Sequence, residues 1–253
     1  MPGVGRLLLP AGWTKAQCNE LSKKYVWHHA KLILEAARLS SMTFEEGRRR
    51  VIFNGEEHLI EALKKGRGAM LVGNHVGNWL FSVGYLSVVG YKISVVAYEI
   101  PIRSIQTHMQ SLARRCNPEI TNVGRGATMT ALRAFKKNEV FLALTDVSLR
   151  PTRGKWFRLG HTAIQVDTGP AKLALMTDTP ILYLSNHRQP DSRVVISISP
   201  EIDRTDTPDS LTQRWLDELH KQLTSWPEQW WLLALIPLRT PDSVLVSPAR
   251  ESV

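Results

Sequence analysis

The stretch GNHVGNWL, residues 73–80, places a histidine between two Gly-Asn pairs, after one apolar run and before another. The short, apolar residues 68–74 predict a buried strand, and residues 79–90 predict a helix. His75 would then follow the carboxyl end of a strand, which is where open α/β sheets bind ligands. A neutral imidazole in this place suits a general base acting on a hydroxyl or amine. The alternative interpretation is a histidine that only caps or packs.

Segments on both sides of this turn alternate between helical and extended patterns. Helices are expected over residues 15–39, 55–65, 104–115, 128–138, 166–178 and 208–224, and strands over 92–100, 139–146, 180–188 and 193–202. This alternation predicts an α/β fold with a mixed, mostly parallel sheet flanked by helices. We expect a single domain over 1–253, with a helical N-terminal segment (1–45) and a loose tail (238–253).

Composition excludes several classes of protein. The chain has 253 residues, of which 43% are hydrophobic and 22% are charged, as in ordinary globular proteins. Its two cysteines, Cys18 and Cys116, cannot form a disulfide framework or a zinc cage, and they favour a reduced, cytoplasmic setting. No His, Cys and Asp cluster has metal-ligand spacing, so neither a metal nor another cofactor is expected. No apolar window reaches the length of a transmembrane helix.

The net charge of +9 has two interpretations, an attractive field for an anionic partner or a contribution to solubility alone. Nucleic acid, an anionic membrane surface, a phosphorylated substrate and an acidic carrier protein all fit this charge. The basic residues are scattered and are not interleaved with aromatic side chains, so nucleic acid is not expected. A contact with the membrane surface stays open.

A second candidate region follows another predicted strand. Asp146 ends that strand, and Arg150, Arg153, Lys155 and Arg158 then put four cations into nine residues. Such a loop suits a phosphate or a phosphopantetheine-type anion. A solvated basic loop without a ligand is the alternative.

Three blocks of the chain carry a resemblance to a known family. They read EHLIEALKKGRGAMLVGNHVGNW at 57–79, FRLGHTAIQVDTGPAKLALMTDTPIL at 157–182 and PEQWWL at 227–232. Their order and content resemble the late lipid A acyltransferases and the related phosphatidylinositol-mannoside acyltransferases. The likeness extends over roughly residues 45 to 235.

This resemblance implies a glycerolipid-acyltransferase-like fold and acyl transfer from a thioester. The donor would be an acyl carrier protein or coenzyme A, and the acceptor a hydroxyl or an amine. In the family the motif histidine, here His75, removes the acceptor's proton, and an acid five residues later orients it. We expect substrate-binding residues within the matched blocks and the basic loop, at Asn78, Arg150, Arg153, Arg158, Gly160 and Gly169.

The sequence departs from the family pattern at Leu80, which stands where the motif has Asp or Glu. Leucine cannot accept a hydrogen bond or balance an imidazolium. Three explanations follow: Asp146 or Glu99 supplies the carboxylate, or an amine acceptor needs only a weak base, or acyl transfer is lost. In the last case the chain would bind a carrier or lipid without turnover, or act as a thioester hydrolase or condensing enzyme.

A second departure concerns the beginning of the chain. Family members usually start with a hydrophobic anchoring helix, and no such helix is predicted here. We therefore expect a cytoplasmic protein, free or on the inner face of the membrane, that acts on a soluble or carrier-bound metabolite.

Overall fold

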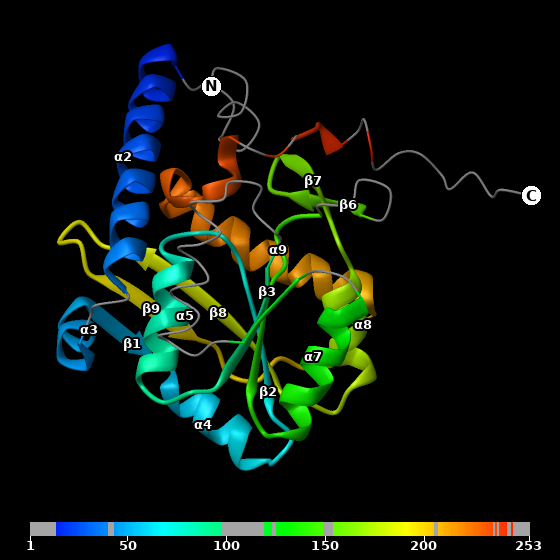
Figure 1. Cartoon of the computed structure of the whole chain (residues 1–253). Coiled ribbons are helices and arrows are strands. Elements are labelled where there is room, and N and C mark those ends of the chain that lie inside the picture. Colours follow the sequence, from blue (N-terminus) through cyan, green and yellow to red (C-terminus); the bar gives the residue numbers. More distant parts are fainter. Residues whose placement is uncertain are drawn as a thin grey trace, which may run out of the picture.

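The computed structural model (Figure 1) describes residues 14–39, 43–97, 119–122, 125–148, 154–204, 207–234, 236, 238–241 and 244. Its helices are α2 (Lys15–Leu39), α3 (Phe44–Arg50), α4 (Glu56–Lys64), α5 (Trp79–Val88), α7 (Arg125–Lys136), α8 (Gly169–Met176) and α9 (Pro208–Ser225), with short 3-10 helices η1 (Pro227–Gln229) and η2 (Trp231–Ala234). Its strands are β1 (Val51–Asn54), β2 (Ala69–Gly73), β3 (Ile93–Ala97), β4 (Glu119–Asn122), β5 (Val140–Leu144), β6 (Lys155–Leu159), β7 (Thr162–Val166), β8 (Ile181–Arg188) and β9 (Val194–Ile198).

Seven of these strands form one sheet in the order β1-β9-β8-β2-β5-β3-β4. Only the β8–β9 pair within it is antiparallel, and every other neighbouring pair is parallel. Helices α4, α5, α7, α8 and α9 flank the sheet (Figure 1). The predicted mixed, mostly parallel α/β fold is therefore confirmed.

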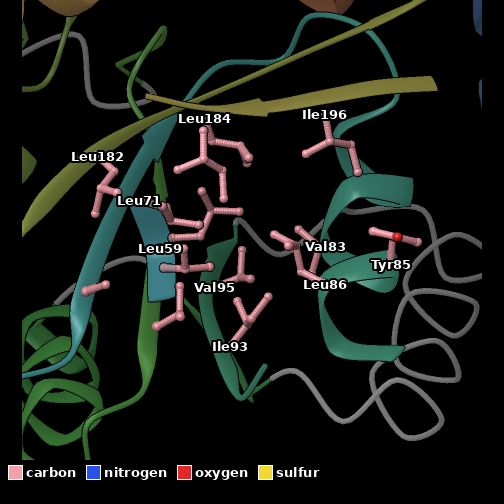
Figure 2. Close-up of a cluster of buried hydrophobic side chains, with 14 of the residues drawn as sticks. Leu59, Leu71, Val83, Tyr85, Leu86, Ile93, Val95, Leu182, Leu184 and Ile196 are labelled. Carbon is pink, nitrogen blue, oxygen red and sulfur yellow. The ribbon is translucent and has the colours of Figure 1, made fainter. Parts of the chain in front are cut away.

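The central strand β2 is buried along its whole length, which explains its unbroken apolar sequence AMLVG. Successive side chains of a strand point to opposite faces of a sheet. Leu71 packs on one face in the cluster of Figure 2, which includes Leu59 and Leu182. Met70 and Val72 pack on the other face, in a cluster to which α7, α8 and α9 contribute. Both faces of β2 are thus covered, and its carboxyl end leads into the loop that carries His75.

The pairing of β2 with β5 decides what meets at that end. Gly73, the last residue of β2, is in register with Leu144, the last residue of β5. The residues two positions beyond each of them are His75 and Asp146. Two strands that are far apart in the sequence therefore deliver these two side chains to the same edge of the sheet.

Several elements differ from the sequence expectation. The strand β1 and the helix α3 were not predicted, and the basic region 154–166 forms the antiparallel hairpin β6–β7 where a loop was expected. Arg239, inside the expected loose tail, exchanges two backbone hydrogen bonds with Ala163 of β7, so the chain is held at that point. The helix expected over 104–115 lies outside the described residues. In the described part of the chain, none of the helices is both long and apolar enough to cross a bilayer.

Candidate active site

The loop of residues 74–78, hereafter the His75 loop, joins β2 to α5 and has a fixed backbone conformation. The Asn74 side chain accepts a hydrogen bond from the Val76 amide at 3.0 Å, and the Asn78 side chain caps α5 by accepting from the Phe81 amide at 3.0 Å. Gly77 adopts a positive φ of 66°, and a Cβ there would lie 2.8 Å from the backbone oxygen of Asn186. The position therefore requires glycine.

His75 and Asp146 form a hydrogen-bonded pair. The Nδ1 atom of His75 lies 2.7 Å from Oδ1 of Asp146, and the His75 backbone amide donates to Oδ2 at 2.8 Å. The indole Nε1 of Trp230 donates to the same Oδ2 at 2.9 Å. Asp146 is 1% exposed, whereas the His75 side chain keeps 17% of its surface accessible. The carboxylate is thus buried behind an imidazole that solvent reaches.

Burial by itself would raise the pKa of the Asp146 carboxyl, but its partners reverse that effect. The charge and hydrogen bonds of His75 and the Trp230 indole lower the pKa below its ordinary value. Asp146 is therefore an ionised acceptor, and the proton in its bond to His75 is on Nδ1. This tautomer leaves the lone pair of the imidazole on Nε2.

The segment Pro227–Trp231 packs against the His75 loop. The Gly77 amide donates to the Gln229 carbonyl at 3.0 Å, and the Trp231 amide donates to the His75 carbonyl at 2.9 Å. Val76 and Trp230 form an antiparallel bridge between the two segments. The PEQWW sequence therefore pairs with the His75 loop by backbone bonds and supplies the indole that contacts Asp146.

Helix α2 braces the same loop from its other side. Its Glu35 accepts from the Asn78 side chain at 2.7 Å and forms a partly buried, bidentate ion pair with Arg188 of β8. His28 donates from Nε2 to the Gly77 carbonyl at 3.3 Å. Burial lowers the pKa of His28 to about 4, so this imidazole is neutral at physiological pH. His28 and His29 are both buried.

The other expected site residues are placed as follows. Leu80 packs against the apolar cluster of Figure 2, and Glu99, Arg150 and Arg153 lie outside the described residues. Lys155 is paired with Asp209 of α9, with the closer contact at 2.8 Å. Asn78 is fully buried, with both ends of its amide bonded within the protein.

The remaining three expected residues lie on the β6–β7 hairpin and at the start of α8. Arg158 is exposed on β6. Gly160 makes the hairpin turn with a φ of 59°, and a Cβ there would lie 2.8 Å from Nδ1 of His220. Gly169 begins α8 and is exposed, and a Cβ there would lie 3.9 Å from Oδ1 of Asp167, an ordinary contact distance.

Sequence reasoning did not identify Trp230, Gln229, Glu35 or Arg188 as parts of the site. The PEQWWL motif was the available signal for the first two, since a signature of that kind near a chain end indicates a shared structural task. Glu35 and Arg188 had no local signal, because their pairing joins residues 153 positions apart. Among the described residues, no group of three or more His, Cys, Asp or Glu side chains is arranged to hold a metal ion.

The fold and this pair define a class of protein: an α/β enzyme with a histidine–carboxylate pair at the carboxyl edge of its sheet. The sequence model of the bacterial lipid A biosynthesis acyltransferases matches residues 6–235, so the chain belongs to that family and is an acyltransferase. Membership implies two kinds of substrate, an acyl donor and a hydroxyl acceptor.

The crystal structure of the 1-acyl-sn-glycerophosphate (LPA) acyltransferase PlsC from Thermotoga maritima is similar to this chain at 16% sequence identity and a TM-score of 0.44. The similarity covers 78% of this chain and 80% of that one. No curated protein matches the sequence.

Proposed function

We propose that the protein moves an acyl group from an acyl-carrier-protein or coenzyme A thioester to a hydroxyl or amine, with His75 as the general base. Asp146 takes the role that the motif gives to the acid at position 80. It holds the imidazole in the tautomer with Nδ1 protonated and balances the positive charge that forms during the reaction.

The proposed reaction has two steps. First, Nε2 of His75 takes the acceptor's proton while the acceptor oxygen or nitrogen bonds to the thioester carbonyl carbon. The tetrahedral intermediate then expels the thiolate as the carbon–sulfur bond breaks, and the imidazolium returns its proton to that sulfur. The products are an ester or amide and a free thiol, and His75 is neutral again.

The observation that carries this proposal is the 2.7 Å contact between Nδ1 of His75 and Oδ1 of Asp146. It supports Asp146 as the replacement for the motif acid at Leu80, since the Asp146 carboxylate lies behind the imidazole although it comes from a different strand. The second oxygen of Asp146 is held by two N–H donors, so the carboxylate cannot rotate away without losing both.

For the donor, we propose that the basic region binds the phosphate of a phosphopantetheine arm or of coenzyme A. Arg158 is exposed on β6, and Arg150 and Arg153 belong to the same run of cations. Gly169, exposed at the start of α8, would admit the donor close to the backbone. We further propose that the enzyme works at the cytoplasmic side of the membrane, where such thioesters occur.

The test is the mass of the product formed from a panel of acyl thioesters, with and without hydroxyl and amine acceptors. We expect an ester or amide and a free thiol from the native enzyme, and loss of the product in His75→Ala. Free fatty acid as the sole product would replace the proposal with hydrolysis. Thioester binding without turnover, unchanged in His75→Ala, would replace it with a binding protein.

A further inference from the structure

Helix α2 is apolar on two opposite faces. Its inner face buries Leu21, Tyr25 and Leu32, and it packs beside α5 and η1 (Figure 1). Tyr25 also donates from its hydroxyl to the Trp231 carbonyl at 2.8 Å. This packing is enough to bury the apolar face of a helix that has only one. The second apolar face of α2 is the unexplained feature.

The outer face carries four large apolar side chains with more than half of their surface exposed. Their exposed fractions are 63% for Val26, 67% for Trp27, 57% for Ile33 and 67% for Leu34. Val26 and Ile33 are seven residues apart, as are Trp27 and Leu34, so the four lie along one stripe. The exposed Ala30 falls between them. We call these five residues the outer stripe.

No other described helix exposes such a group. The remaining exposed large apolar residues are Ile60 on α4, Met129 and Leu132 on α7, and Met176 on α8. Single exposed apolar residues are ordinary, whereas a contiguous stripe marks a surface that contacts a partner.

Lysines accompany the outer stripe. Lys23 and Lys24 are exposed on the preceding turn, and the Lys31 ammonium lies 5.4 Å from the centroid of the Trp27 ring. Glu20 is an exposed acid one helical turn before Lys23, and its Oε2 atom lies 4.0 Å from the Lys23 ammonium. An aromatic side chain beside long cationic ones suits the boundary between an apolar phase and water, because lysine stems lie on apolar surface while their ammonium groups reach outward.

We propose that the outer stripe docks on an anionic lipid bilayer, with its apolar side chains in the headgroup boundary and its lysines among the anionic headgroups. A second copy of the chain is disfavoured because it would offer these lysines little opposite charge: the acids of α2 are Glu20 and Glu35, and Glu35 is already paired with Arg188. An acidic carrier protein would match the lysines but would need a groove for a convex stripe, whereas fluid lipid needs none.

The inner face of the same helix gives this docking a consequence for the site. His28 contacts Gly77, and Glu35 contacts Asn78, so α2 is bonded directly to the His75 loop. An α-helix with its side chains is about 10–12 Å across. The His75 loop therefore lies about one helix diameter from the lipid surface.

The experiment measures sedimentation of the full chain with vesicles of phosphatidylcholine, with or without phosphatidylglycerol. The test variant is Trp27→Glu/Leu34→Glu, and the matched control is Met129→Glu/Met176→Glu, which makes the same charge change at exposed positions elsewhere. Glutamate is a good helix former, so both variants keep their helices. Turnover of a water-soluble thioester without vesicles is measured in parallel.

We expect the native protein to bind the anionic vesicles, more weakly at high salt and more weakly to phosphatidylcholine alone. The test variant should bind at least about tenfold more weakly while the control binds like the native protein. Native protein that does not sediment, or equal losses in both variants, would overturn the proposal. So would a native dimer in light scattering that the test variant abolishes. Turnover without vesicles should be unchanged in the test variant, which separates this result from failure of the proposed acyl transfer.

Discussion

Replacing Asp146 by asparagine should reverse the tautomer of His75, and the geometry dictates the direction. Oδ2 of Asp146 accepts from two N–H groups, the His75 amide and the Trp230 indole. In Asp146→Asn the amide oxygen must occupy that place, because an NH₂ group cannot accept either bond. The NH₂ group then faces Nδ1 of His75, which has to become the acceptor. The imidazole proton moves to Nε2, the atom that the mechanism needs free.

The size of the effect follows from that reversal. In a serine protease, removing the orienting carboxylate with the geometry left intact lowers kcat by about 10⁴. Each factor of ten corresponds to about 1.4 kcal/mol in the barrier. We expect a loss of about 10³ to 10⁴ in kcat for Asp146→Asn, with KM little changed because no substrate contact is removed. The loss should persist on raising the pH, since alkali does not restore the required tautomer.

The assay is steady-state release of free thiol from an accepted acyl thioester, with acceptor present. Circular dichroism and thermal unfolding of the variant serve as the folding control. If folded Asp146→Asn retains a tenth or more of the native kcat, Asp146 does not orient the base and the reasoning from Oδ2 is wrong.

Three further predictions concern the surroundings of the pair. Trp230→Phe removes one hydrogen bond to a charged group and should lower kcat by about tenfold. It should also shift the acid limb of the pH–rate profile, whereas the control Trp231→Phe should leave that limb in place. If both variants have the same profile, Trp230 contributes only packing. Leu80→Glu should not raise turnover, because Asp146 already accepts the hydrogen bond from Nδ1 of His75. It should lower the free energy of unfolding by about 1 kcal/mol or more, because it places a charge against an apolar cluster. A gain in kcat would contradict the proposal that Asp146 replaces the motif acid. The pKa of His28 is about 4 in the folded protein and near 6.5 in the unfolded chain. The unfolded chain therefore binds more protons than the folded protein between these pH values. As the pH falls from 6.5 to 4, the folded protein should lose roughly 3 kcal/mol of stability from His28. Denaturant unfolding of His28→Gln, whose amide can still donate to Gly77, should lack this part of the pH dependence, and an unchanged pH dependence would refute the assignment.

The sequence was sufficient for the fold class because its strongest signals are local. The unbroken apolar run of β2 and the Gly-Asn pairs around His75 each specify their own conformation, and they correctly placed His75 beyond the end of a strand. The hairpin β6–β7 was not predicted, because four cations in nine residues obscured the alternation of apolar and polar side chains along its strands.

The partner of His75 was harder to predict for a physical reason. Asp146 was one of two candidates, and nothing local distinguished it from Glu99. What distinguishes it is the β2–β5 register, in which Gly73 pairs with Leu144 and so brings positions 75 and 146 together. Register depends on packing between distant strands, which a single sequence does not display. The Trp230 contact is likewise set by the fold of residues 227–231 against the loop.

The central claim, that Asp146 holds His75 ready as a base, can be tested without knowing the acceptor. The measurement is the ¹⁵N NMR signal of the His75 ring nitrogens in the neutral imidazole, in the native protein and in Asp146→Asn. Our account predicts a protonated Nδ1 and an unprotonated Nε2 in the native protein, reversed in the variant. A native His75 protonated on Nε2, or a tautomer that the substitution leaves unchanged, would contradict it.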